Sequence, residues 1–281
     1  MSSASPWPQE YYNALRFYYW EPQLLNRHAN AKRQDRTCAE VMGNVARSEV
    51  SLNHLLNIFF NLAPAALTAR FFGRYLRGWS PERLESHVRP TLSVAPSIDL
   101  CQTDFLFLGR DSIVAMEMKV KHKTSVKQAV KYALFMHHYG QSIGGTRRRP
   151  YLLYLSPSED RVWEHGLTFG SFAAALDSFE LSSTIKQFAD LCGHSRADVL
   201  AIAAAMPLSH ATYQELGGFL AVEAAALDGS EGGETLRNLI GGVLDELAAR
   251  GLVAGQPEAI GDGVALTTLT TLATRARHGG T

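Results

Sequence analysis

The chain has 281 residues, 46% of them hydrophobic, and its 27 Lys and Arg balance its 27 Asp and Glu. That is enough apolar sequence for one large domain or two modest ones. No stretch reaches the roughly 18 apolar residues of a transmembrane helix, and the N-terminal residues lack the pattern of a signal peptide. Cys38, Cys101 and Cys192 show neither zinc-ligand nor redox spacing, which is typical of a reducing compartment. We therefore expect a cytoplasmic protein without a membrane partner.

Charge is distributed unevenly along the chain. Residues 1–160 hold 20 Lys and Arg against 13 Asp and Glu, a balance of +7, whereas residues 161–281 hold 7 against 14, a balance of −7. Five of the seven lysines lie within 119–131. The basic front half is suited to nucleic acid, and the acidic back half is a poor partner for phosphate.

The first elements in chain order are helical. Aromatic residues predict a short helix over 7–20, packed against the core or a second subunit. Apolar residues at helical spacing predict a helix over 38–62. A second helix is predicted over 64–77, where Arg70, Arg74 and Arg77 recur at helical spacing and form a solvated basic face. Glu49 falls on or beside the apolar stripe of the 38–62 helix, where a carboxylate needs a partner. An arginine in a structural salt bridge and a metal ion are the two alternatives.

The next elements predict a compact α/β core, a mixed sheet flanked by helices. Strands are expected over 91–95, 104–108, 112–119 and 151–155, with a helix over 125–139 that Ser125 caps.

A hairpin within this core brings three charged residues together. Asp104 opens its first strand, and Glu117 and Lys119 close the second, after a Gly-Arg-Asp turn. Strand residues two apart face the same side, so Glu117 and Lys119 should point together toward Asp104. Two carboxylates and an ammonium at a sheet edge suit a divalent metal and a phosphodiester. A solvated salt bridge at a strand end is the alternative interpretation.

Beyond residue 160 the sequence becomes rich in Ala, Leu and Gly. Helices are expected near 165–178, 182–192, 196–206, 212–223 and 234–249. With wing strands at Leu252-Val253 and Val264–Leu269, residues 210–271 follow a winged-helix pattern. The second of its helices carries one early base, Arg237, so we favour dimerisation or a protein partner over DNA contact for this region.

Gln128 and Tyr132 are four residues apart on the helix that follows the hairpin and share one face. With them, residues 38–155 resemble the PD-(D/E)XK nuclease superfamily, in particular its RecB-like branch with a Gln-x-x-x-Tyr helix. Asp104 matches the first metal acid, Glu117 and Lys119 the (D/E)-x-K, and Glu49 an additional acid. Asp99, in Pro-Ser-Ile-Asp, is a rival for the first acid, and we prefer Asp104 because it begins the strand paired with that of Glu117.

The resemblance implies a restriction-endonuclease-like core and a metal-dependent nuclease, acting on DNA, with a role in restriction, phage defence or repair. Asp104 and Glu117, with Glu49, would bind Mg²⁺, for which Mn²⁺ can substitute. Lys119 would orient water or stabilise developing charge, and Gln128 and Tyr132 would position phosphate or the lysine. Contacts to the nucleic-acid backbone are assigned to Lys121, Lys123, Lys127, Lys131, Arg147, Arg148 and Arg149.

We therefore expect a nuclease-like domain over 1–160 and a helical or winged-helix accessory domain over 161–281. The alternative from another class is a non-catalytic DNA-binding or regulatory protein that keeps a nuclease-like core.

Overall fold

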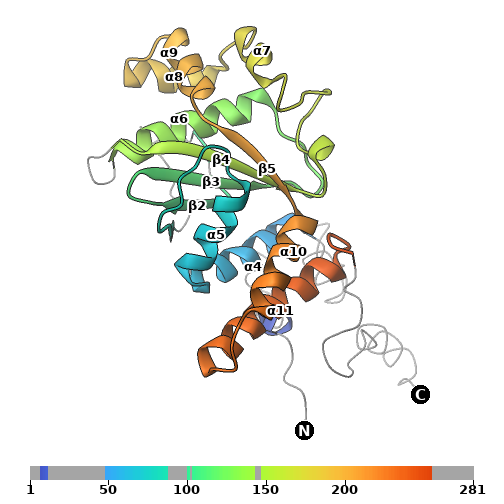
Figure 1. The fold of residues 1–281 in the computed structure, drawn as a ribbon. Helices are drawn as coiled ribbons and strands as arrows, with labels where there is room; N and C mark the ends of the chain where they lie inside the picture. Colours follow the sequence, from blue (N-terminus) through green and yellow to red (C-terminus); the bar gives the residue numbers. More distant parts are fainter. Residues whose placement is uncertain (1–6, 12–47, 88–99, 102, 143–146, 255–281) are drawn as a thin grey trace, which may run out of the picture.

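A five-stranded mixed sheet lies between two layers of helices (Figure 1). The structure is a computed structural model, and it describes residues 7–11, 48–87, 100–101, 103–142 and 147–254. The expected strand at 91–95, the rival acid Asp99 and the wing strand at 264–269 lie outside the described residues.

The strands follow one another across the sheet in chain order. They are β1 (Glu85–His87), β2 (Phe105–Leu108), β3 (Ser112–Met118), β4 (Arg149–Ser156) and β5 (Leu208–Thr212). Strands β1, β2 and β3 pair antiparallel, and β3, β4 and β5 pair parallel. The carboxyl ends of β3, β4 and β5 therefore share one edge of the sheet with the start of β2.

The expected hairpin is confirmed. Phe105 pairs with Met116 and Leu108 with Ile113. Glu82 holds the turn, because its Oε2 accepts hydrogen bonds from the backbone nitrogens of Arg110 at 2.8 Å and Asp111 at 3.1 Å. Both faces of these strands are buried, since helices cover each side, which explains their continuous apolar sequence.

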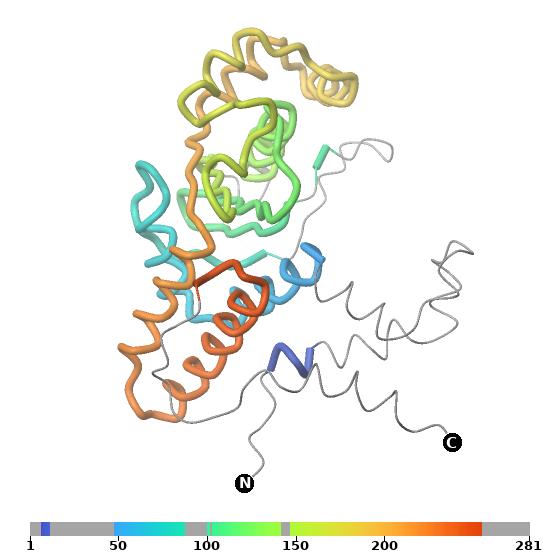
Figure 2. The backbone as a smooth tube through the Cα atoms, turned by 90° about the vertical axis from the view of Figure 1, so that its right-hand side faces the viewer, coloured from blue at the N-terminus to red at the C-terminus, as the bar shows by residue number. Residues whose placement is uncertain are grey.

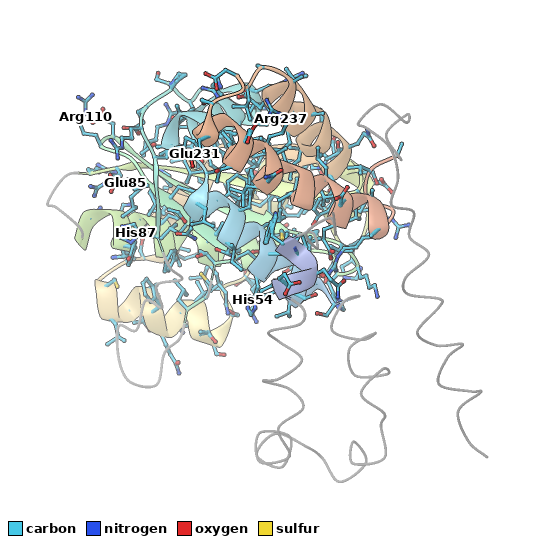
Figure 3. All side chains as sticks on the ribbon, turned by 90° about the horizontal axis from the view of Figure 1, so that it is seen from below. His54, Glu85, His87, Arg110, Glu231 and Arg237 are labelled. Atoms are coloured by element: carbon cyan, nitrogen blue, oxygen red, sulfur yellow. The ribbon has the colours of Figure 1, made fainter. Side chains whose placement is uncertain are left out.

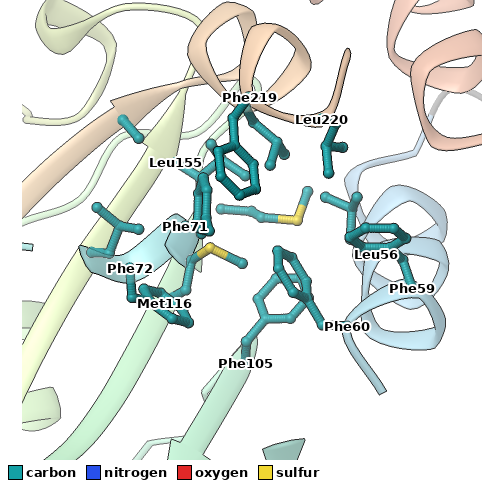
Figure 4. Close-up of a cluster of buried hydrophobic side chains, with 14 of the residues drawn as sticks. Leu56, Phe59, Phe60, Phe71, Phe72, Phe105, Met116, Leu155, Phe219 and Leu220 are labelled. Atoms are coloured by element: carbon teal, nitrogen blue, oxygen red, sulfur yellow. The ribbon is translucent and has the colours of Figure 1, made fainter. Parts of the chain in front are cut away.

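One helical layer is formed by segments from both ends of the described chain. It contains α4 (Glu49–Leu62), α5 (Ala65–Tyr75), α10 (Tyr213–Ala225) and α11 (Glu231–Ala249). Phe60 of α4 contacts Phe105 of β2 edge to face, Phe71 of α5 contacts Phe60, and Phe219 of α10 contacts Phe71 (Figure 4). Each fully buried ring contributes about 1.5–3 kcal/mol through removal of apolar surface from water.

The other face of the sheet is covered by α6 (Val126–Ser142), with α7 (Phe172–Asp177), α8 (Ser183–Cys192) and α9 (Arg196–Ala204) beyond it (Figure 1). A short 3-10 helix, Glu159–Arg161, follows β4. The helices expected in these segments are present, with α7 shorter than expected. The α6 helix runs three residues past its expected end.

Both the sheet and the core continue beyond residue 160. Strand β5 pairs with β4, and Leu216 and Phe219 of α10 share a hydrophobic cluster with Leu52 of α4. The boundary expected at residue 160 thus falls between neighbouring strands of one sheet. The sequence pattern predicts neither β5 nor β1.

The prediction of a first wing strand at Leu252-Val253 is wrong. Gly251 adopts a φ of +66° and ends α11, and the backbone nitrogen of Leu252 donates to the Leu247 carbonyl at 2.9 Å. Gly251, in the left-handed backbone conformation, thus caps α11. The cap uses the Leu252 N–H that a strand would need for pairing. Val253 then lies close to Gly217 of α10.

The helical residues 7–11 pack beside α4 and α11 (Figures 2 and 3). The indole nitrogen of Trp7 donates to the Leu239 carbonyl at 3.0 Å, and Tyr11 hydrogen-bonds His54 at 3.2 Å. For this part of the aromatic segment, packing against the core is the interpretation that the structure bears out.

Within the described ranges, no single helix has the length and apolarity needed to cross a membrane. Helices α4 and α5 meet that criterion only as a pair, across a bend of 117°.

Candidate functional site

The candidate site lies at the edge where β3 and β4 end and β2 begins (Figure 1). Asp104 directly precedes β2, Glu117 is the penultimate residue of β3, and Lys119 follows that strand. Strand alternation turns Glu117 toward α6, on the same side as Ile113 and Ala115. The backbone nitrogen of Lys119 donates to the Leu155 carbonyl at 2.8 Å, which continues the ladder and fixes the strand end.

Glu117 is the centre of a hydrogen-bond network. Its Oε1 accepts from Lys119 Nζ at 2.7 Å and from Gln128 Nε2 at 2.9 Å. Its Oε2 accepts from the hydroxyl of Tyr132. Glu117 is only 5% exposed and Lys119 6%, so each charge depends on the other as its partner.

Helix α6 supplies two of these donors from one face, because Gln128 and Tyr132 are one turn apart. The hydroxyl of Thr124 donates to Gln128 Oε1 at 2.9 Å, which directs the amide nitrogen toward Glu117. Ser125 Oγ accepts from the Gln128 backbone nitrogen at 3.4 Å, as expected of its capping role. Sequence reasoning found Gln128 and Tyr132 but missed Thr124, whose only signal is its place between β3 and α6.

Asp104 is the most perturbed acid at the site. Its Oδ2 accepts from the Met118 backbone nitrogen at 2.9 Å. Burial, followed by the negative charge of Glu117, raises the pKa of Asp104 to about 8. Two carboxyl groups therefore compete for one partly buried space, an arrangement that a cation would relieve. Asn57 of α4, which sequence reasoning missed, donates to the Asp104 carbonyl at 3.1 Å.

Glu49 reaches the site from the first turn of α4. Its Oε1 accepts from the Val120 backbone nitrogen at 3.3 Å, just beyond Lys119. Its Oε2 is buried without a hydrogen-bond partner, and Glu49 forms no ion pair with any described residue. Arg250 instead pairs with Glu246 at 2.6 Å. The salt bridge to arginine that was one alternative for Glu49 is therefore not seen among the described residues.

The lysines cluster near the acidic residues. Lys121 and Lys123 follow Lys119 in the loop after β3 and are exposed, as is Lys127 at the start of α6. Lys131, one turn further, is half-buried. These lysines lie in the loop before α6 and in its first two turns, the part of the helix that carries Gln128.

The three arginines at 147–149 lie at the other end of the sheet. Arg149 pairs with Ser112, whereas Glu117 pairs with Tyr154, five residues further along β4. That separation is about 16 Å. Arg148 also uses its guanidinium to bind the carbonyls of Gly109 at 2.8 Å and Gly140 at 3.2 Å. The structure therefore does not bring Arg147, Arg148 and Arg149 to the acidic site.

The donor set fits a hard divalent cation. Asp104, Glu117 and Glu49 offer oxygen ligands, and Mg²⁺ needs only one or two carboxylates because it retains waters. The unpartnered oxygen of Glu49 and the crowding of Asp104 against Glu117 are the observations that favour such an ion. In the part of the chain that the structure describes, no three His, Cys, Asp or Glu side chains are already arranged around a common metal position.

The chain matches no model of a known protein family, no curated protein and no solved structure.

Proposed function

We propose that this protein is a metal-dependent nuclease that hydrolyses phosphodiester bonds, with DNA as its expected substrate. The observation that carries the proposal is the meeting of Asp104, Glu117 and Lys119 at one sheet edge, beneath Gln128 and Tyr132 of α6. This is the set of residues that the resemblance to the PD-(D/E)XK superfamily singled out, and the mixed sheet flanked by helices supports that resemblance.

Asp104 and Glu117 would hold Mg²⁺, with Glu49 as a third ligand. When bound, the ion would supply Lewis-acid polarisation of the scissile phosphate. Asp104 is suited to this role because it is partly accessible, whereas Glu117 lies deeper and is held in place by three donors.

Lys119 would place a positive charge beside the phosphate as negative charge develops on it. Its ammonium is fixed by Glu117 at 2.7 Å, so little reorganisation is needed at the moment of reaction. Gln128 and Tyr132 hold Glu117 from above and thereby position the lysine. The exposed Lys121, Lys123 and Lys127 would bind the nucleic-acid backbone without reading its sequence.

The second candidate is a non-catalytic nucleic-acid-binding or regulatory protein. It is favoured by the complete hydrogen bonding of Glu117, because a carboxylate satisfied by Lys119, Gln128 and Tyr132 also suits a purely structural ion pair. In that case the lysines would bind nucleic acid and no bond would be cleaved. Restriction, phage defence or repair are biological settings that suit the nuclease.

Cleavage assays distinguish the two candidates. Plasmid DNA, single-stranded DNA and RNA are incubated with Mg²⁺, Mn²⁺ or EDTA. We expect cleavage that needs a divalent ion and falls by about a hundredfold or more in Asp104→Asn and Lys119→Met. Asp111→Asn is a matched control, because Asp111 lies at the exposed turn of the same hairpin, where the same chemical change should leave the rate unchanged.

Full activity in Asp104→Asn and Lys119→Met would refute the site assignment. Absence of cleavage from every substrate, together with a gel shift that is lost when Lys123 and Lys127 become glutamine, would select the non-catalytic alternative.

A further inference from the structure

A buried tyrosine from the C-terminal half of the chain reaches the same edge of the sheet. Tyr213 is the first residue of α10 and directly follows β5. It is 0% exposed, and its hydroxyl has no hydrogen-bond partner among the described residues. A buried hydroxyl without a partner is unusual in a folded protein and calls for a specific explanation.

The position of Tyr213 is fixed by the local structure. Thr212 and Glu215 form a reciprocal capping box at the start of α10, with the Glu215 backbone nitrogen donating to Thr212 Oγ1 at 3.0 Å. Thr212 pairs with Ser156 at the end of β4. Tyr213 therefore lies just beyond the carboxyl edge that also carries Lys119, and its ring packs in the same cluster as Leu52 of α4.

The acids of the candidate site act on Tyr213 through their charges. Burial, and then the charges of Glu49 and Asp104, raise the pKa of Tyr213 well above its ordinary value, so its hydroxyl keeps its proton. Glu49 Oε2 is likewise buried and has no hydrogen-bond partner among the described residues. Two buried polar groups at this edge of the sheet therefore lack partners there, and one is a carboxylate that needs positive charge or a donor.

We propose that Tyr213 is a positioning residue of the cation site, acting on an ion held by Glu49 and Asp104. This rests on the proposed function, because it assumes that these carboxylates bind a divalent ion. Glu49 Oε2 would face the ion, and the Tyr213 hydroxyl would hydrogen-bond one of the waters that Mg²⁺ or Mn²⁺ retains. The C-terminal segment β5–α10 thereby completes a site whose other members precede residue 133.

The experiment is a titration of the full chain with MnCl₂ and, separately, MgCl₂, followed by thermal unfolding. The wild-type melting temperature is expected to rise with ion concentration, because the ion binds only the folded state. We define the ion midpoint as the ion concentration that raises the melting temperature by a chosen fixed amount. In Tyr213→Phe the ion midpoint should be about tenfold higher, as is usual when a group behind a metal ligand is removed.

The stability without metal gives an independent readout. Tyr213→Phe removes an unpaired buried hydroxyl and should raise the melting temperature of the metal-free protein. Tyr151→Phe is the matched control. Tyr151 is a buried tyrosine at the other end of β4 whose hydroxyl donates to the Gly78 carbonyl at 3.0 Å. Loss of the Tyr151 hydroxyl should lower the melting temperature of the metal-free protein and leave the ion midpoint unchanged.

A second variant separates the ion from a buried water. In Glu49→Gln the ion should bind weakly, and adding Tyr213→Phe should then produce no further shift, because the two residues act on the same ion. An unchanged ion midpoint in Tyr213→Phe would overturn the proposal. The partner of the Tyr213 hydroxyl would then be an ordinary buried water. A Tyr213→Phe protein that fails to fold, or a wild-type protein that gains no stability from either ion, would also overturn it.

These outcomes are distinguishable from failure of the proposed function. An ion midpoint that responds to Tyr213, in a protein that cleaves no nucleic acid, supports the inference and refutes the nuclease. Metal-dependent cleavage, together with an ion midpoint that Tyr213→Phe leaves unchanged, supports the nuclease and refutes the inference about Tyr213.

Discussion

The two ends of the β2–β3 hairpin carry the same kinds of residue in opposite environments. At the turn, Arg110 and Asp111 form an ion pair whose side chains are 87% and 68% exposed (Figure 3). At the other end, Glu117 and Lys119 form an ion pair that is almost completely buried. Glu82 and exposure to solvent satisfy the turn. The buried end depends on a few placed donors, and Glu49 Oε2 there has no hydrogen-bond partner among the described residues.

The difference shows where this protein accepts a cost in stability. A polar turn open to solvent needs no ligand. A buried end with crowded carboxyl groups is poorly satisfied by the protein alone, and such sites are candidates for binding and chemistry. Composition does not separate the two ends, since each contains acid and base.

The largest expected difference between the two ends is the free energy of unfolding that is lost when each ion pair is broken. Glu117→Ala should lower the free energy of unfolding by about 3–5 kcal/mol, because it leaves Lys119 charged and buried without a partner. Asp111→Ala should leave the urea midpoint unchanged, since its pair is exposed. Equilibrium urea unfolding measures both. The double variant Glu117→Leu with Lys119→Met should regain most of the loss, and equal stability of Glu117→Ala and wild type would contradict this comparison.

The next prediction concerns the carboxylate that holds the turn. Glu82→Ala should lower the free energy of unfolding by about 1–3 kcal/mol, because hydrogen bonds from two backbone nitrogens to a charged group are lost. Any cleavage activity should be retained, because the turn lies at the far end of the strands. Parallel unfolding and cleavage measurements check this, and a variant that is stable but inactive would show that the two ends are coupled.

Asp104 should make stability depend on pH in the direction opposite to most acids. Its pKa is about 8 in the folded protein and near 3.8 when unfolded, so folding retains a proton that the unfolded chain releases. The stabilisation is present below pH 3.8 and is lost as the pH rises toward 8. Between about pH 4 and 8, metal-free wild type should therefore lose stability relative to Asp104→Asn. Thermal unfolding across this range tests it, and parallel profiles would contradict the assignment.

The smallest expected effect is at the far end of α6. His138 hydrogen-bonds His194 at 3.0 Å, and burial, followed by the charges of His137 and His194, lowers the pKa of His138 to about 4. Because the unfolded value is 6.5, stability is full above pH 6.5 and falls as the pH drops toward 4. His138→Leu should show a weaker fall in melting temperature over this range. An identical fall in both proteins would assign the effect to other groups.

Much of the candidate site could be predicted because its members are close in sequence. Strand periodicity and the Gly-Arg-Asp turn placed Asp104 beside Glu117, and helical periodicity placed Gln128 and Tyr132 on one face of α6. These are short-range geometric rules, and the hairpin and helix follow them. Helical spacing also predicted α4, from its apolar residues, and α5, from its arginines, whereas the winged-helix pattern predicted α10 and α11.

Other parts of the site depend on pairings between distant segments. The sequence predicts that Arg147–Arg149 bind nucleic acid at the acidic site, but the parallel pairing of β3 with β4 places them at the opposite edge of the sheet. Strand β5, Leu208–Thr212, buries Ser209 and Ala211, so it lacks the continuous apolar run that identified β2. Asn57 and Tyr213 have no sequence signal, because each reaches the site only through the packing of its helix.

The sequence by itself determined the apolar strands, the helices, and the acid, base and amide residues that gather at the end of one hairpin. Local backbone geometry and periodic burial are sufficient for those, since they act over a few residues. Only the tertiary structure decided that residues beyond 160 extend the same sheet, that Glu49 has no arginine partner among the described residues, and that Tyr213 is buried at the same edge of the sheet. Those outcomes depend on which distant surfaces exclude water from one another, and no short stretch of sequence specifies that.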